Sequence, residues 1–465
     1  MIANTAHYSS DTSTDWKVAV EKLLVSPRGA IDAAVFTQQK HALVFCKAYR
    51  HALSKEDRRT ILSHLLSQYS RSKLKNVCVE QKEIDEKWLT EMTKLLKDTP
   101  PLYQKLFRAI GQVEDGIKLL VDLRADVLAW LREIQMIVAS DRGQTDAPPI
   151  TLRLMDLVLR DLLSIWFSIG LLEVHRITWK SPCDLLQRVA EYESVHPVRS
   201  WTDLKQRVGS YRRCFVFTHP SVPREPLVVL HVALMDRIPE RIAEVIASHR
   251  NEKADFEDEE NSNDIQTAIF YSINSTQTGL QGIDLGHFLI KRVVQQLSAE
   301  LPSLNAFSSL SPIPGFRKWL MEELRRVGKG HVTHMPLEPN ELSLLAKTLI
   351  DDGKNAWFND EAAREQLRPI LLRACAFYLL RLKHRGYAYD PVANFHLRNG
   401  AMLWRINWAG DPTAKGLNQS CSIMVNYRYY LNRTDEYSRS YLDDKQVHTH
   451  EQVTSIFNLA QRSGL

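Results

Sequence analysis

The fold is decided by one stretch, Ala268-Ile-Phe-Tyr-Ser-Ile-Asn274 followed by Ser275-Thr-Gln-Thr-Gly-Leu-Gln-Gly-Ile-Asp-Leu-Gly286. Its first seven residues are mostly apolar, with β-branched and aromatic side chains, as in a strand covered on both faces. After the glycines, Leu289, Val293 and Leu297 recur at helical spacing. The stretch therefore predicts a strand, a glycine-rich turn and a helix, which is the unit of an α/β domain.

The same pattern continues on both sides of this stretch. Short apolar runs at Cys214 to Thr218 and Leu227 to Leu234 alternate with helical segments in the second half of the chain. Before Leu172 the spacing is helical, as in Leu102 to Val138. We therefore predict an α+β protein with an all-helical domain over 1–172 and an α/β domain over 173–465.

The composition excludes several classes of protein. With 465 residues, 44% of them apolar and 25% charged, the chain is typical of globular proteins with two domains. A net charge of +5 forms no basic stripe, so we expect no nucleic-acid binding. Leu152 to Leu172 is interrupted by charges, so we expect no membrane span. The amino terminus has no apolar run, which indicates a cytoplasmic location.

The first candidate site is the glycine-rich turn. A helix that starts at Gly286 would offer free amide groups to phosphate oxygens, as the diphosphate of a nucleotide-like cofactor requires. The spacing matches neither a Walker A loop nor the glycine pattern of a dinucleotide fold. An ordinary turn before a core helix explains the glycines equally well.

The second candidate is Ser311, within Phe307-Ser-Ser-Leu-Ser-Pro-Ile-Pro-Gly-Phe316. Pro312 and Pro314 disfavour a helix or a central strand, so we expect Ser311 on a stiff loop after a strand. A rigid mount suits a group that positions a substrate. Many serines before proline, however, only begin a turn.

The third candidate is His396, within Asp390-Pro-Val-Ala-Asn-Phe-His-Leu-Arg-Asn-Gly400. Its polar neighbours and the preceding proline indicate a polar pocket and not an apolar helix face. Histidine can give or take a proton near neutral pH. A structural histidine is the competing interpretation, because the chain has 16 of them.

A family resemblance connects these pieces. It extends from about Leu172 to the C-terminus and, more loosely, over the helical half. It is carried by six strings in fixed order: His231-Val-Ala-Leu234, Ala268 to Leu289, Ser309-Leu-Ser-Pro-Ile-Pro-Gly-Phe316, His384-Arg-Gly-Tyr387, Asn394-Phe-His-Leu397 and Leu403-Trp-Arg-Ile-Asn-Trp408. Together they resemble the malonyl-CoA decarboxylases. The resemblance implies a helical domain used in oligomer contacts and a catalytic domain related to the GNAT acetyltransferases.

The resemblance also assigns site residues. It implies that Ser311 and His396 are catalytic and that Tyr429, in Asn426-Tyr-Arg-Tyr429, lines the pocket. It further implies that CoA is bound by a loop and helix start made of Gln281, Gly282, Ile283, Asp284, Leu285, Gly286 and His287.

The implied reaction converts malonyl-CoA to acetyl-CoA and CO2 through an enolate that an oxyanion hole stabilises and the Ser/His pair protonates. The substrate's own thioester carbonyl accepts the electrons, so we expect no cofactor and no metal. A homo-oligomer, dimer or tetramer, and a role in fatty acid metabolism are also implied. Two alternatives stay open, an acyl-CoA N-acyltransferase of the GNAT fold and a non-catalytic CoA-binding scaffold.

Two departures from the family pattern affect these expectations. Asp284 stands where a relative has glutamate, so its carboxylate would reach one methylene less far. Cys183 matches a cysteine that crosslinks subunits in some relatives, but Pro220 replaces the second one. We therefore expect no such crosslink at position 220.

Overall fold

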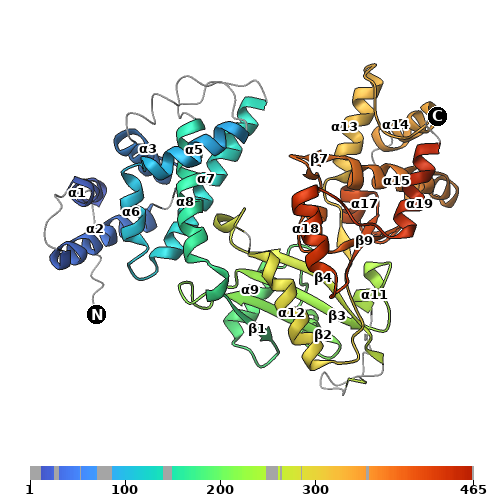
Figure 1. Cartoon of the computed structure of the whole chain (residues 1–465), viewed down its shortest axis with the longest axis horizontal. Coiled ribbons are helices and arrows are strands. Elements are labelled where there is room, and N and C mark those ends of the chain that lie inside the picture. Colours follow the sequence, from blue (N-terminus) through green and yellow to red (C-terminus); the bar gives the residue numbers. More distant parts are fainter. Residues whose placement is uncertain are drawn as a thin grey trace, which may run out of the picture. The chain divides into compact units, whose positions relative to one another are not determined.

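The structure is a computed structural model of the chain (Figure 1). It describes residues 12–25, 31–52, 54–70, 86–139, 149–247, 260–261, 264–283, 285–351 and 355–462. Contacts divide the chain into two compact units. Unit 1 contains residues 1–173, 218–227 and 275–285, and unit 2 contains 174–217, 228–274 and 286–465. The sequence predicted a single boundary after residue 172 and did not predict that two later segments join unit 1.

Unit 1 is mainly helical over the residues described (Figure 1), whereas its segment 218–227 forms no helix. Its α-helices are α1 (Thr12–Val25), α2 (Ile31–His51), α3 (Lys55–Tyr69), α5 (Glu86–Asp98), α6 (Tyr103–Ile110), α7 (Gly116–Ala139) and α8 (Pro149–Trp166). Short 3₁₀ turns occur at η1 (Ile169–Leu171) and η3 (Thr278–Leu280). Leu120, Leu123 and Val127 of α7 are fully buried at helical spacing, which shows that packing of an apolar helix face holds the unit together.

Unit 2 contains a mixed sheet covered by helices. Its strands are β1 (Glu173–Ile177), β2 (Arg212–Thr218), β3 (Val228–Met235), β4 (Thr267–Ser275), β5 (Ala306–Ser309), β6 (Ser311–Pro312), β7 (Lys383–His384), β8 (Tyr387–Ala388), β9 (Met402–Asn407) and β10 (Met424–Tyr429). Its helices are α9 (Cys183–Tyr192), α10 (Trp201–Arg207), α11 (Ile242–Ala247), α12 (Gly286–Glu300), α13 (Phe316–Gly328), α14 (Pro339–Ala346), η4 (Lys347–Asp351), η5 (Ala356–Phe358), α15 (Glu361–Arg381), α16 (Pro391–Arg398), α17 (Ala414–Ser420), α18 (Thr434–Asp444) and α19 (Glu451–Arg462).

The sheet order places the end of the chain beside its middle. Among the described residues the order is β1-β2-β3-β4-β5-β10-β6, and β9 also pairs with β10. Strands β4 and β5 are parallel, whereas β10 runs antiparallel to β5, β6 and β9. Strand β10 is therefore the element against which β6 is aligned. The helical part followed by an α/β part with a mixed sheet confirms the predicted fold class.

Two hydrophobic clusters make up much of the core of unit 2. One joins α9 and α10 to β2 and β3, through residues such as Val189, Leu204 and Val216. The other joins α11 to β3, β4 and β10, and includes Leu310, the residue between β5 and β6. Burial of a side chain such as Leu310 contributes about 1.5–3 kcal/mol, so the segment that carries Ser311 is firmly anchored.

A buried arginine fixes the glycine-rich segment within unit 1. Arg124 on α7 is 2% exposed. Its Nε donates to Asp156 on α8 at 2.8 Å, and its Nη1 donates to the carbonyl of Gly279 at 2.7 Å. A Cβ at Gly279 would come within 1.8 Å of the Val121 carbonyl oxygen. Gly279 is therefore required for packing against α7.

We expect Arg124→Ala to lower the free energy of unfolding by about 3 kcal/mol, because removing one partner of a buried ion pair leaves the other groups without compensation. Chemical denaturation would measure the loss. The control is Lys118→Ala, since the Lys118–Asp122 pair on the same helix is half-exposed and should contribute less than about 1 kcal/mol. Equal effects of the two variants would contradict the role given to Arg124.

Candidate active site

Three polar side chains from distant parts of the sequence form a hydrogen-bonded chain inside unit 2. Ser311 Oγ lies 2.9 Å from Nε2 of His396, and Nδ1 of His396 lies 2.7 Å from the Tyr429 hydroxyl. They are 5%, 2% and 3% exposed, respectively. Strand β10 aligns β6, because Val425 pairs with Ser311, and β10 ends at Tyr429 itself. The contact is a candidate site for proton transfer.

His396 is held by the short helix α16. Asp390 caps this helix, because its Oδ1 accepts the amide protons of Val392 at 3.0 Å and Ala393 at 2.9 Å. Pro391 occupies the first helical position, where an amide proton would have no partner. His396 therefore lies on a helix, while its polar partners, as the predicted pocket requires, are Ser311 and Tyr429. The Asp-Pro pair is a helix start signal, and the polar surroundings of His396 come from other elements.

Ser311 lies in a strand and not on the predicted loop. Ser311 and Pro312 form β6, which pairs with Val425 and Met424 of β10. Pro312 has no amide proton to donate, but a two-residue strand can include it where the pairing ends. The prolines therefore shorten the strand and do not abolish it. The position remains rigid, as we expected, because β10 holds it on one side.

Burial determines the charge of the His396 ring. It lowers the pKa of His396 to about 3 and raises the pKa of Tyr429 well above its usual value. The ring of Tyr427 stacks on the imidazole, with centroids 4.6 Å apart and an interplanar angle of 16°. At neutral pH the imidazole is thus uncharged and the Tyr429 hydroxyl keeps its proton. Any proton that His396 gives must come from a neutral ring, as in some characterised enzymes.

The helix cap gives a pH-dependent stability. Burial raises the pKa of Asp390 to about 6, although amides of Ala393 and Val392 oppose the shift. The folded-state pKa of Asp390 lies above its unfolded value. The contribution of Asp390 to the free energy of unfolding is therefore fully present below about pH 4 and is lost as the pH rises through about 6. Asp390→Asn keeps a capping oxygen and cannot ionise. We expect the stability difference, variant minus wild type, to rise by about 2 kcal/mol between about pH 4.5 and 8.

Denaturant unfolding at the two pH values would measure this change. A control is Asp360→Asn, because Asp360 caps α15 in the same way through the amides of Ala362 and Ala363 but is exposed. The change with pH that Asp390→Asn shows beyond that of Asp360→Asn is then due to the buried cap. Equal changes in the two variants would show that the buried cap is not a weak acid.

The predicted CoA loop lies largely in unit 1. Gln281 and Gly282 are exposed, Ile283 is half-buried and Leu285 is buried. Gly282 has a φ of +78°, a left-handed conformation that glycine adopts without strain. Gly286 begins α12 in unit 2. The structure describes neither Asp284 nor the side chain of His287. The role of this loop stays a prediction.

The sequence interpretation missed two residues that contact the site. Ser309 accepts a hydrogen bond from Ser311, with their Oγ atoms 2.8 Å apart, and Tyr427 stacks on His396. Each lies two positions from a residue that we did single out, Ser311 and Tyr429. Alternate residues of an extended chain share a face, so this spacing was the signal that could have identified both.

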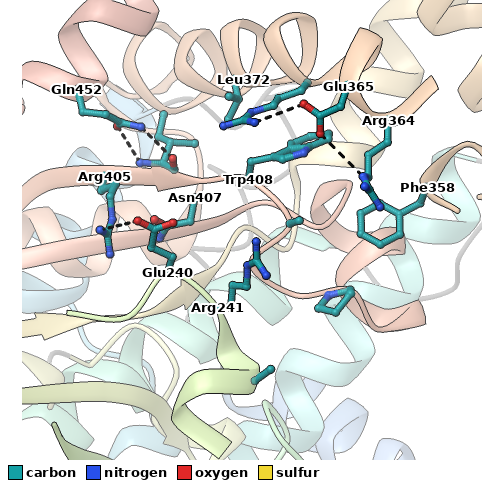
Figure 2. A pocket seen from close by; sticks show the side chains of 15 residues that line it. Glu240, Arg241, Phe358, Arg364, Glu365, Leu372, Arg405, Asn407, Trp408 and Gln452 are labelled. Atoms are coloured by element: carbon teal, nitrogen blue, oxygen red, sulfur yellow. Dashed lines mark hydrogen bonds and ion pairs between the residues drawn. The ribbon is translucent and has the colours of Figure 1, made fainter. Parts of the chain in front are cut away.

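A separate cavity of about 680 Å³ lies in unit 2, and none of the predicted site residues lines it. Figure 2 shows two of its arginines directed at glutamates. Arg405 Nη1 lies 3.1 Å from Glu240, and Arg364 Nε lies 3.9 Å from Glu365. Two further arginines, Arg241 and Arg368, give the lining four arginines against two glutamates, so it carries a net positive charge. The lining includes neither Ser311 nor His396, so the cavity is separate from the candidate pair.

Other features limit what the described part of the chain can hold. Over these residues, no group of three or more His, Cys, Asp or Glu side chains is arranged to hold a metal ion. The described cysteines are free thiols, and Cys183 is exposed while the others are buried. No described helix combines the length and the apolar character that crossing a lipid bilayer requires.

Comparisons with known proteins agree over most of the chain. The family model of the malonyl-CoA decarboxylase C-terminal domain matches residues 170–464, and that of the N-terminal domain matches 59–167. Malonyl-CoA decarboxylase, mitochondrial, of Mus musculus is 47% identical over 365 residues, which are 77% of this chain and 71% of that protein. The Rattus norvegicus protein of the same name is 46% identical over 367 residues, with the same two shares.

Solved structures give the same result. The crystal structure of malonyl-CoA decarboxylase from Rhodopseudomonas palustris has a TM-score of 0.76 and 31% identity, covering 96% of this chain and 100% of that chain. The structure from Agrobacterium vitis has the same TM-score and coverage at 29% identity.

Proposed function

The chain belongs to the malonyl-CoA decarboxylase family of carboxy-lyases, and on that premise we propose that it converts malonyl-CoA to acetyl-CoA and CO2 at Ser311 and His396. One observation carries the proposal: a serine hydroxyl and a neutral imidazole lie in contact, 2.9 Å apart, where water has little access. Such a pair can protonate a strongly basic carbon without first giving its proton to solvent.

The chemistry needs a proton and a site for negative charge. The bond between the malonyl carboxylate and the adjacent CH2 carbon breaks, CO2 leaves, and the electron pair moves into the thioester carbonyl. The resulting enolate carries its charge on the thioester oxygen. Hydrogen-bond donors fixed around this oxygen would stabilise it, and a single donor is typically worth about 3 kcal/mol. Because the thioester accepts the electrons itself, the reaction requires no organic cofactor or metal.

We assign the proton to His396. Its N–H is a very weak acid, but the enolate carbon is a stronger base than the imidazolate that would result. The Tyr429 hydroxyl, 2.7 Å from Nδ1, can give its proton to the ring as Nε2 loses one. Ser311 either turns its proton from Ser309 to the malonyl carboxylate or passes the proton between His396 and the carbon. Solvent supplies the one proton that each turnover consumes.

We assign substrate binding to the loop from Gln281 to His287, together with Tyr429. The amides at the start of α12, which have no partner within the helix, suit the diphosphate of CoA. In the loop itself Gly282 is exposed, whereas the amides of Gln281 and Ile283 donate to the carbonyls of Thr278 and Leu280, both at 3.0 Å. In this assignment Tyr429 has two roles: its hydroxyl contacts the ring of His396 at 2.7 Å, and its side chain lines the substrate pocket.

An assay with purified protein and malonyl-CoA tests the function, in parallel reactions with and without added primary amine. A decarboxylase yields equal amounts of acetyl-CoA and CO2 in both. An acyl-CoA N-acyltransferase would consume malonyl-CoA only when the amine is present, and would yield an amide and free CoA. Tight CoA binding without turnover would favour the non-catalytic scaffold.

Family membership supports two further proposals, on assembly and on metabolic role. We propose a homo-oligomer, dimer or tetramer, built through the helical unit, and a role in fatty acid metabolism. For location we predicted the cytoplasm, whereas the mouse and rat relatives are named as mitochondrial. Light scattering and cell fractionation test the first and last of these.

A further inference from the structure

The hydroxyl of Ser309 lies next to the candidate pair and only accepts hydrogen bonds from its two described partners. Ser311 Oγ donates to it at 2.8 Å, and the amide of Tyr427 donates to it at 3.3 Å. Ser309 is fully buried. Its oxygen therefore sets the direction in which the Ser311 proton points.

This direction determines where the proton of His396 lies. A serine hydroxyl has one proton, and that of Ser311 is used on Ser309. Its contact of 2.9 Å with His396 Nε2 can then be a hydrogen bond only if Nε2 carries a proton. A neutral imidazole has one N–H, so Nδ1 is bare and accepts the Tyr429 hydroxyl at 2.7 Å. The proton order runs from Tyr429 through His396 and Ser311 to Ser309.

We propose that Ser309 is a positioning residue that keeps the proton of His396 on Nε2, the nitrogen beside Ser311. The inference rests on the proposed function, because only an acid at this nitrogen needs the arrangement. Ser309 does not touch the reacting atoms and acts through Ser311. Without its oxygen, Ser311 can turn its proton to Nε2, and His396 can carry its proton on Nδ1 and donate it to Tyr429. This reversed proton order satisfies the same hydrogen bonds as the order described above. It leaves Nε2 of His396, the nitrogen beside Ser311, without a proton to give.

Ser309 is held firmly enough for this role. Its carbonyl accepts the side-chain amide of Asn426 at 2.9 Å, and its strand pairs in parallel with β4 opposite Phe270. The neighbouring Ser308 is equally buried, yet its hydroxyl donates to the carbonyls of Ser309 and Tyr427, both at 3.2 Å, and no described contact joins it to Ser311. Ser308 is therefore a matched control with the same residue type, strand and burial.

The test compares Ser309→Ala with Ser308→Ala in the full-length protein. For Ser309→Ala we expect kcat on malonyl-CoA to fall about 10- to 100-fold. The loss is smaller than the roughly 10²–10⁴ of full acid–base catalysis, because Ser311 can still rotate into the orientation that leaves the His396 proton on Nε2. KM should stay within about threefold, since no substrate contact is removed. The solvent deuterium isotope effect on kcat should rise, because enolate protonation becomes slower. Ser308→Ala should keep the wild-type kcat and isotope effect.

A wild-type kcat and isotope effect in Ser309→Ala would overturn the inference, as would equal losses in the two variants. If Ser309→Ala does not fold, Ser309→Thr and Ser309→Val decide, because they have the same shape and differ in the hydroxyl. The kcat of Ser309→Thr should exceed that of Ser309→Val by about tenfold or more. Equal kcat values would refute the positioning role of Ser309. Failure of the proposed function is distinguishable, because the wild type would then release no CO2 from malonyl-CoA.

Discussion

Replacement of His396 by alanine is expected to lower kcat on malonyl-CoA by about 10²- to 10⁴-fold, the usual contribution of a positioned acid or base. The enolate would then have to take its proton from water that enters a buried site, and Ser311 would lose its partner at 2.9 Å. CoA affinity should change little, because the ring is not among the residues assigned to the CoA loop.

The measurement combines steady-state kinetics with calorimetric titration of CoA. His396→Gln is the second variant, since it removes the imidazole but fills more of the buried space. The control is His448→Ala, because His448 stacks on Tyr437 in the same unit and has no described contact with Ser311. It should retain kcat within about threefold. Near-normal turnover in His396→Ala with intact CoA binding would refute the proton-donor role.

Replacement of Ser311 by alanine is expected to lower kcat by about 10²-fold, at the lower end of acid–base effects. The change leaves Nε2 of His396 without its hydroxyl partner and removes the group that binds the carboxylate or relays the proton. Because these interactions matter most as CO2 departs, the loss should appear in kcat and equally in kcat/KM.

Ser308→Ala again serves as the control for a small change at a buried serine. Full kinetics on malonyl-CoA with both variants would separate the two roles of Ser311. A loss confined to KM, with unchanged kcat, would reduce Ser311 to a group that binds substrate and transition state equally.

Elements defined by local pattern could be predicted from the sequence. The strand from Thr267 to Ser275 and the helix that begins at Gly286 were anticipated from an apolar run, glycines and helical spacing. Strand β2 begins at Arg212, earlier than the predicted start at Cys214. The prediction left out the two arginines because charged residues are seldom buried in a strand. Arg213 is buried by bidentate contact with Glu260 and by Glu300, distant in sequence, which no local pattern reveals.

The site needed more than local pattern. Family strings singled out Ser311, His396 and Tyr429, but their contact depends on the pairing of β6 with β10 and on the docking of α16. The prolines led the sequence analysis to miss two elements: the short strand that includes Pro312 and the helix that begins at Pro391. Proline excludes the interior of an element, whereas both residues lie at an element's end. Ser309 was not singled out, although its spacing from Ser311 could have identified it, because the hydrogen bonds of its hydroxyl cannot be read from the sequence.

The most direct test of the central claim is kcat of the double variant Ser311→Ala/His396→Ala, compared with the two single variants. The claim is that the hydroxyl and the imidazole work as one proton-transferring unit. The double variant should then be no slower than the slower single variant, because the first substitution already disables the unit. Losses that multiply would show two independent contributions and would contradict the account.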